Sequence, residues 1–301
     1  MNDRIKTSMA ILILLLMQFG MASAQQVVQE KAEPEKITSG YQFTEGPVWH
    51  PSGYLLFSDI PANTIYKWLP GSDAETYLSP SGHSNGLTFD GQGRLILAQH
   101  DGAIASYSDD RGIKVLVAAY QGKRLNSPND LVVHSDGSIY FTDPPFGVSE
   151  EEKVLDINGV YRYHKEEGLQ LLSDDFDLPN GIALSPDESK LYVNDSRHKH
   201  IRVFDITKDG TLTNGRLFAK MDSDERGGAD GMKVDMQGNV YSTGPGGLWI
   251  FSPEGNLIRQ VKTPRLTNLA WGGKDGKTLF MTAPDAVYKL KMTNKGYTPY
   301  R

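Results

Sequence analysis

Most apolar residues of this chain lie in short runs in which every second position is apolar. Leu87 and Phe89 belong to one such run, and Leu95 and Leu97 belong to the next, after the turn at residues 91–93. A period of two residues is typical of β-strands, whereas helices repeat every 3.6 residues. Because no segment has the pattern of a long amphipathic helix, the sequence predicts an all-β fold.

One plan of strand, turn and strand occurs six times along the chain, and each copy begins with a residue that carries a side-chain oxygen. The copies begin at Glu45, Asn85, Asn129, Asn180, Asp230 and Asn268, at intervals of 40, 44, 51, 50 and 38 residues. Four-stranded propeller blades have this spacing. The sequence therefore predicts a six-bladed β-propeller as a single domain over residues 25–301. Residues 35–44 are expected to close the ring against the last blade.

The first residues of the six copies are expected to face one another, because equivalent positions of the blades surround the central channel of a propeller. None of them offers sulfur or imidazole. Ca²⁺ takes 6–8 oxygen ligands, and Mg²⁺ and Mn²⁺ also suit oxygen, whereas Zn²⁺ favours Cys and His and is the weaker candidate. Asn and Asp also serve as turn residues that bond their own backbone. Six such residues in register, with Glu45 among them, favour a divalent cation in the channel.

The segment Gly82-His83-Ser84-Asn85-Gly86 fits the G-x-S-x-G pattern of a serine-hydrolase nucleophile. That pattern requires a strand, a sharp turn and then a helix. Here Asn85-Gly86 opens a predicted strand, and the other copies carry their own oxygen residue at the same place. We therefore interpret Ser84 as a structural residue.

The segment from Asp222 to Lys233 has a faint likeness to the calcium-binding loop of an EF-hand. Its fifth position is Arg226 and its twelfth is Lys233 in place of Glu, and no flanking helices are predicted. These departures argue against an EF-hand and leave calcium binding elsewhere in the chain open.

Composition narrows the classes of function. The formal net charge of −6 and the absence of a basic run make nucleic acid a poor partner. The chain has no cysteine, so disulfides and thiolate metal sites are both excluded.

Residues 1–24 combine Arg4 and Lys6, an apolar run and the small residues Ala22-Ser23-Ala24, which is the pattern of a secretory signal peptide. The run is short for a membrane span, although an uncleaved anchor is the alternative. We expect an exported protein, periplasmic or secreted, with no membrane contact after cleavage.

Taken in order, the segments EGPVW, SPNDLVVHSDGSIYFTD, LPNGIALSPD and GGADGMKVDMQGNVYSTG resemble the bacterial gluconolactonase branch of the regucalcin/gluconolactonase family. The resemblance covers nearly all of the chain after residue 24. It implies a six-bladed propeller with a divalent cation in the channel, held by Glu45, Asn180 and Asp230. It also implies that Asn129 contacts the metal or the substrate and that Asp230 is the base.

The resemblance implies hydrolysis of a sugar lactone to its hydroxy acid, with Ca²⁺ polarising the carbonyl oxygen. We expect Asn85 and Asn268 to contact the substrate. His83 precedes a ring position, and His100 ends the hairpin of the same blade. Both are candidates for the channel mouth because histidine transfers protons near neutrality, although a structural role is the alternative.

Two features concern the walls of the pocket. Animal members of the family carry an arginine two positions before the asparagine that Asn129 matches. Ser127 stands there in this chain, and Arg124 is a candidate substitute.

The loop Pro144–Asn158 exceeds the usual length of connections in compact domains, which predicts a lid or binding loop at the substrate pocket. Its acidic run is most simply a solvated face.

Two other functions stay open on the same fold. The metal could serve the hydrolysis of aryl esters, organophosphates or other lactones, because variable loops form the pocket walls. The propeller could instead be a non-catalytic binding platform with a structural metal.

Overall fold

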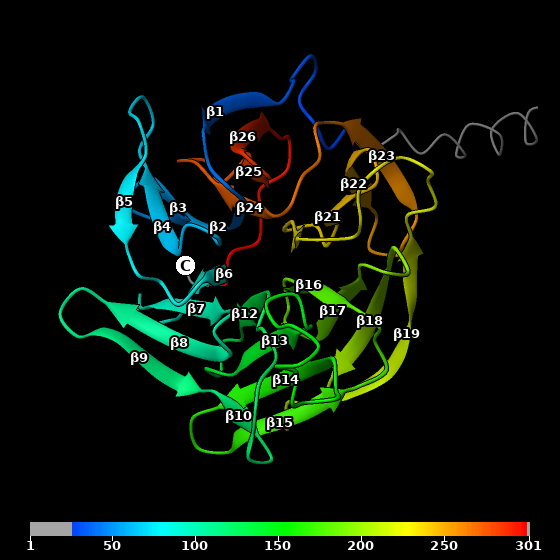
Figure 1. Cartoon of the computed structure of the whole chain (residues 1–301). Coiled ribbons are helices and arrows are strands. Elements are labelled where there is room, and N and C mark those ends of the chain that lie inside the picture. The colour runs from blue at the N-terminus through cyan, green and yellow to red at the C-terminus, as the bar shows by residue number, and fades with distance from the viewer. Residues whose placement is uncertain (1–25, 300–301) are drawn as a thin grey trace, which may run out of the picture.

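The computed structural model describes residues 26–299 of the chain. In this part, the strands form six four-stranded antiparallel sheets, arranged around a central axis as the blades of a propeller (Figure 1). The predicted six-bladed all-β fold is confirmed. The expected signal peptide, residues 1–24, lies outside the described residues. No helix among residues 26–299 is long and apolar enough to cross a membrane.

Each copy of the repeat supplies one blade, and the first strand of each copy lies innermost. The first blade consists of β2 (Thr44–His50), β3 (Tyr54–Asp59), β4 (Thr64–Trp68) and β5 (Glu75–Leu78). The second consists of β6 (Ser84–Phe89), β7 (Leu95–Gln99), β8 (Ala103–Ser108) and β9 (Gly112–Val117). A two-stranded ribbon, β10 (Ala119–Tyr120) and β11 (Lys123–Arg124), leads to the third blade.

The remaining blades follow the same order from the axis outward. The third consists of β12 (Leu131–Val133), β13 (Ile139–Asp143), β14 (Gly159–His164) and β15 (Gly168–Ser173). The fourth consists of β16 (Pro179–Leu184), β17 (Lys190–Asp195), β18 (His200–Ile206) and β19 (Leu212–Lys220). The fifth consists of β20 (Met232–Val234), β21 (Val240–Gly244), β22 (Gly247–Phe251) and β23 (Leu257–Lys262).

The sixth blade joins the two ends of the described chain. It consists of β24 (Leu269–Gly272), β25 (Thr278–Ala283), β26 (Ala286–Lys291) and, as its outermost strand, β1 (Glu35–Ser39). The pairing of β1 with β26 is antiparallel and aligns Glu35 with Lys289. The predicted closure of the ring is therefore confirmed for residues 35–39, whereas Thr44 already belongs to β2.

Apolar side chains fill the spaces between neighbouring blades. Val48 packs with Leu87 and Leu97 between the first and second blades. Its neighbour Trp49 points the other way and stacks on Phe280 of the sixth blade, with ring centroids 4.9 Å apart. Because successive residues of an inner strand face different blades, both sets are apolar, and each fully buried large side chain contributes about 1.5–3 kcal/mol to stability.

The inner strands approach one another closely around the axis. A Cβ atom on Gly46 would lie 1.9 Å from the backbone oxygen of Asn85, and one on Gly181 would lie 2.2 Å from that of Asp230. Neither position has room for a side chain. Glycine follows the ring residue in four of the six copies, which lets the blades come together at the channel.

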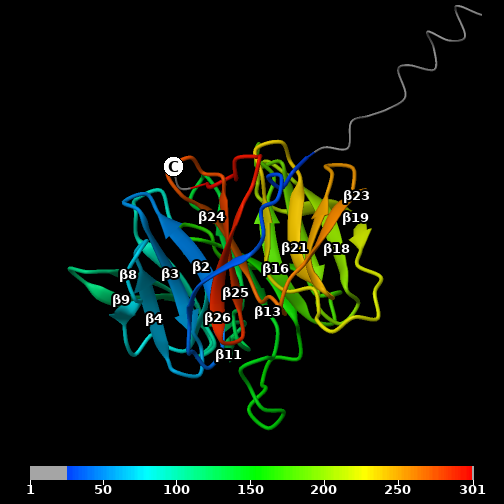
Figure 2. The same cartoon turned by 90° about the horizontal axis from the view of Figure 1, so that it is seen from above.

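The two mouths of the channel differ. The C-terminal residues lie across one face of the ring, and the loop after β13 projects from the opposite face (Figure 2). The Tyr297 hydroxyl donates a hydrogen bond to Glu188 Oε1 at 2.8 Å, and the Met236 amide donates to the Lys295 carbonyl at 2.9 Å. The tail thus crosses turns of the fourth and fifth blades, which leaves the channel open at the other mouth.

Candidate active site in the central channel

A cavity of about 420 Å³ lies at the open mouth of the channel. Five of the six ring residues line it: Glu45, Asn85, Asn129, Asn180 and Asp230. The other lining residues that matter below are His100, Ser196 and Arg265, together with the apolar Phe43, Ile60, Pro61 and Phe146. The repeat therefore brings these ring residues together, as the register of the copies predicts.

Three asparagines form a chain of hydrogen bonds along one side of the cavity. Asn85 Nδ2 donates to Asn129 Oδ1, and Asn129 Nδ2 donates to Asn180 Oδ1, each at 2.5 Å. Asn180 Nδ2 then donates to the Ser196 hydroxyl at 3.0 Å. These bonds fix the orientation of the amide groups. Because a carbonyl oxygen has two lone pairs, each accepting oxygen retains one for a cation or a substrate hydroxyl.

Glu45 is 2% exposed, and its carboxylate is held by neutral donors. Its Oε2 atom accepts hydrogen bonds from Asn268 Nδ2 at 3.0 Å and from the Gly46 amide at 2.8 Å. Among residues 26–299, no basic side chain forms an ion pair with it. Asn268 lies behind Glu45 and does not line the cavity, so the structure gives it a supporting position in place of the predicted contact with substrate.

Without a cation, the ionised forms of the two acidic ring residues are unfavourable. Burial, with a further contribution from Asp130, raises the pKa of Glu45 to about 7. Burial and the negative charge of Glu45 raise the pKa of Asp230 well above its ordinary value. A divalent cation between them would favour the ionised form of both.

The donor set fits a hard divalent cation. Among the described residues, no cluster of three or more His, Asp or Glu side chains could hold a metal. A cation in the channel would therefore need amide oxygens beside the two carboxylates. Ca²⁺ accepts mixed sets of carboxylate and carbonyl oxygens in flexible geometry, whereas Zn²⁺ prefers nitrogen and sulfur. Glu45, Asn129, Asn180 and Asp230 offer such a set.

A second group of acidic residues supports the ring, and the sequence analysis missed it. Asp59, Asp143 and Asp195 end the second strands of the first, third and fourth blades. Their carboxylates accept backbone N–H groups from the segments that lead into Glu45, Asn129 and Asn180, including those of Phe43 at 3.0 Å, Asn126 at 2.9 Å and Asp177 at 2.8 Å. The recurring FSD, FTD and VND at the ends of these strands was the available signal.

The structure separates the two candidate histidines. His100 lines the cavity, where its Nε2 atom lies 3.1 Å from Asn85 Nδ2, and burial lowers its pKa to about 4. The imidazole is therefore neutral and can accept the amide hydrogen. His83 Nδ1 lies 2.9 Å from Asp101 Oδ1, and its side chain is 43% exposed and does not line the cavity.

Ser84 and Arg124 both have structural roles. The buried Ser84 hydroxyl donates to the Ser81 carbonyl at 2.7 Å, which agrees with the structural interpretation of this residue. The Arg124 guanidinium donates to the carbonyl oxygens of Leu125 and Asn126, at 2.9 and 2.8 Å. Arg124 does not line the cavity, so it does not replace the expected arginine.

The loop Pro144–Asn158 reaches the cavity through Phe146, which is 45% exposed. Ser127 anchors the start of this loop, because its hydroxyl donates to the Pro144 carbonyl at 2.6 Å and accepts from the Gly147 amide at 2.8 Å. Ser127, which stands where the family resemblance leads one to expect an arginine, thus anchors the loop that brings Phe146 to the cavity.

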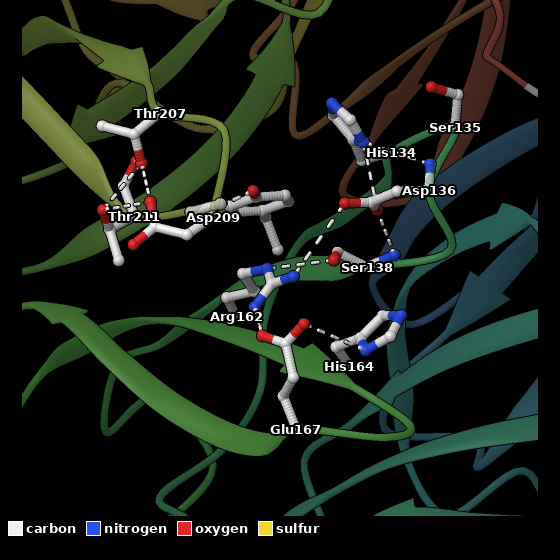
Figure 3. Close-up of polar contacts among 12 residues, drawn as sticks. His134, Ser135, Asp136, Ser138, Arg162, His164, Glu167, Thr207, Asp209 and Thr211 are labelled. Atoms are coloured by element: carbon white, nitrogen blue, oxygen red, sulfur yellow. Dashed lines mark hydrogen bonds and ion pairs between the residues drawn. The ribbon is translucent and has the colours of Figure 1, made fainter.

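A larger cavity, of about 700 Å³, lies at the other face between the turns of the second and third blades. The ionisable groups at and near it pair with one another (Figure 3). His134 Nδ1 lies 3.0 Å from Asp136 Oδ1, and the buried Arg162 contacts Glu167 Oε2 at 2.5 Å. This paired arrangement contrasts with the two carboxylates of the channel, which we therefore take as the candidate active site.

Comparison with known proteins gives a consistent result. Residues 43–284 match the family described as the SMP-30/gluconolactonase/LRE-like region. The chain is 38% identical to the gluconolactonase of Zymomonas mobilis, in an alignment that covers 87% of this chain and 82% of the relative.

Solved structures share the fold. A gluconolactonase of Xanthomonas campestris is 31% identical, with a TM-score of 0.78 over 90% of this chain and 99% of that one. A calcium-binding regucalcin of Agrobacterium tumefaciens, 20% identical, has a TM-score of 0.72 over 92% of this chain and 97% of that one, and shows a likeness of fold alone. The expected family resemblance is confirmed: the chain belongs to the SMP-30/gluconolactonase/LRE-like family.

Proposed function

We propose that this protein is a lactone hydrolase that opens a sugar lactone to its hydroxy acid with the help of a calcium ion in the central channel. The observation that carries the proposal is a cavity lined by two carboxylates and three amide groups, in which neither carboxylate forms an ion pair with a basic side chain of residues 26–299. The kinship with the gluconolactonases of Zymomonas and Xanthomonas supports the choice of reaction.

Glu45, Asn180 and Asp230 would hold the metal, with Asn129 as a further ligand or as a contact to substrate. A calcium ion so held supplies a Lewis acid for the lactone carbonyl. Asn268 and the Gly46 amide keep the Glu45 carboxylate in place, and Ser196 orients the amide of Asn180.

Asp230 is half-buried and lines the cavity, where its carboxylate can accept a proton from the attacking water. Asn85 donates a hydrogen bond to the neutral His100, and together they form one wall beside Asn129. We assign these two residues to the positioning of substrate hydroxyl groups. Phe43, Ile60 and Phe146 form the apolar part of the cavity wall, which would reduce the access of other water molecules to the site.

The decisive experiment follows proton release from glucono-δ-lactone with the protein in calcium and after chelation, with the spontaneous opening subtracted. We expect calcium-dependent turnover that falls about 100-fold or more in Glu45→Gln, because a charged metal ligand is lost. Glu33→Gln, at an exposed position, is the matched control and should retain full activity.

Asp230→Asn separates the two roles of this residue. If Asp230 accepts the proton, the variant stays slow when excess calcium fills the site, whereas excess calcium restores a variant that has lost only a ligand. Calcium binding by the wild-type protein without turnover of any sugar lactone, with or without a carboxylate, would overturn the assignment to sugar lactones. Parallel assays with an aryl ester and an organophosphate would then identify a hydrolase of another ester class.

A further inference from the structure

The cavity has one basic wall residue. Among the described residues that line it, Arg265 is the only lysine or arginine. It lies in the short segment between β23 and β24, three residues before the ring residue Asn268. Its side chain therefore belongs to the rim of the mouth and not to the oxygen ring.

The Arg265 guanidinium is held in place but is not neutralised. It lies over the Phe43 ring, 5.7 Å from the ring centroid, within the range of a cation–π contact. Among residues 26–299, no carboxylate pairs with it, and the residue is exposed at the mouth.

Arg124 provides a contrast within the same part of the molecule. Its guanidinium donates to the backbone carbonyls of Leu125, Asn126 and His100. Those donors are committed to the protein itself, whereas the donors of Arg265 are free to meet a ligand at the cavity.

We propose that Arg265 binds a carboxylate of the substrate, and that the preferred substrates are lactones of sugar acids with a free carboxylate remote from the lactone carbonyl. This inference rests on the proposed function and adds the class of substrate. The planar guanidinium matches a carboxylate in a bidentate, charge-assisted pair, and its contact with Phe43 reduces the freedom lost on binding. A single arginine balances the one negative charge of a carboxylate, whereas it would leave one charge of a phosphate dianion unbalanced.

The same cavity is lined by the ring carboxylates and by Arg265, so one substrate could contact both. Its volume of about 420 Å³ is within the range of small-molecule sites. The lactone carbonyl would lie toward the cation that Glu45 and Asp230 would hold, and the carboxylate would face Arg265 at the rim. The apolar Phe43 lies beneath the guanidinium and beside the carbon skeleton.

Two lactones that differ in one group test the inference. Glucaro-1,4-lactone carries a carboxylate where glucono-1,4-lactone carries a hydroxymethyl group. We expect the wild-type protein to prefer the glucarolactone in kcat/KM, mainly through a lower KM. In Arg265→Gln, kcat/KM for the glucarolactone should fall about 10- to 100-fold more than that for the gluconolactone, as expected for the loss of a charge-assisted pair.

Two further variants sharpen the result. Arg265→Lys keeps the charge without the planar fork and should have an intermediate preference. Arg259→Gln removes the same charge from an exposed position on β23, the strand that precedes Arg265, and should keep the wild-type preference.

Equal kcat/KM for the two lactones in the wild type, or an equal effect of Arg265→Gln on both, would overturn the inference and leave the proposed function intact. If neither lactone is hydrolysed, the proposed function fails, and calorimetric binding of the two intact lactones still decides the role of Arg265. Tighter binding of the glucarolactone that is lost in Arg265→Gln supports the carboxylate contact, and equal binding refutes it.

Discussion

At the scale of single residues, the acidic side chains in and around the channel form two groups with different roles. Glu45 and Asp230 face the cavity, and Asp59, Asp143 and Asp195 stand behind the ring and hold the backbone that leads to it. The position of the ring residues was predictable because the repeat has a register. The supporting aspartates were harder to recognise, because each bonds only backbone N–H groups, which carry no sequence signature of their own.

Asp143 makes stability depend on pH in an unusual direction. Burial raises the pKa of its carboxyl from an ordinary value near 4 to about 7. Between these values the folded protein binds a proton that the unfolded chain has released, so this contribution to stability is full below pH 4 and is lost as the pH rises through 7. Asp143→Asn cannot ionise and should lose this dependence.

We therefore expect the free energy of unfolding of Asp143→Asn, relative to wild type, to rise with pH by up to about 1.4 kcal/mol per unit between pH 4 and 7. Urea unfolding of both proteins across this range measures the difference. Since all other groups are shared, a constant difference would show that Asp143 ionises normally in the folded protein.

At the scale of strands, the inner strands fit together only because glycine follows most ring residues. Gly181, in β16, illustrates this best, since its Cβ position lies 2.2 Å from the backbone oxygen of Asp230 in the next blade. We expect Gly181→Ala to lose about 1–3 kcal/mol of stability or more, because β16 and the segment carrying Asp230 must move apart. Calcium affinity should fall at the same time.

Urea unfolding and calorimetric calcium titration check this expectation. Gly91→Ala is the matched control, because a Cβ atom at Gly91 would have no neighbour within 4 Å. It should change stability by less than about 0.5 kcal/mol. Unchanged calcium affinity in Gly181→Ala would mean that the ring tolerates a wider spacing of the blades.

The strands themselves were predictable to a large degree, with local departures that have physical causes. In the fourth blade, regular pairing begins at Pro179, before the ring residue, whereas in the third it begins at Leu131, two residues after Asn129. The Asn129 carbonyl accepts from the Gly86 amide of the second blade, while the Asn129 amide donates to the Thr142 carbonyl of β13. Periodicity alone does not report such contacts.

At the scale of the whole molecule, the candidate metal ligands Glu45, Asn129, Asn180 and Asp230 come from four different blades, so a bound cation would link these blades to one another. We expect calcium at 100 times its dissociation constant to raise the free energy of unfolding by about 2.7 kcal/mol, since the unfolded chain has no such site. Glu45→Gln should lose this increment and Glu33→Gln should keep it. Thermal or urea unfolding with calcium and with chelator measures the increment, and its absence in the wild-type protein would argue against a calcium site.

The whole architecture followed from the repeat, but the rim of the site did not. Phe43, Phe146 and Arg265 come from segments that differ in length and composition between copies, so no register relates them. Which of these side chains reaches the cavity depends on how each loop folds back over the mouth. His83 shows the same limit, because it precedes a ring residue in sequence and yet turns toward Asp101.

The pairing of β1 with β26 also has a consequence for the order of events during synthesis. The last blade receives its outer strand from Glu35–Ser39, which are synthesised early, and its inner strands from residues 269–291, which are synthesised late. β1 therefore has no partner strand until β26, near the other end of the chain, has been synthesised. A chain that ends before β24 would have neither Asn268 behind Glu45 nor a closed ring, so the site can be completed only after the last blade has been made.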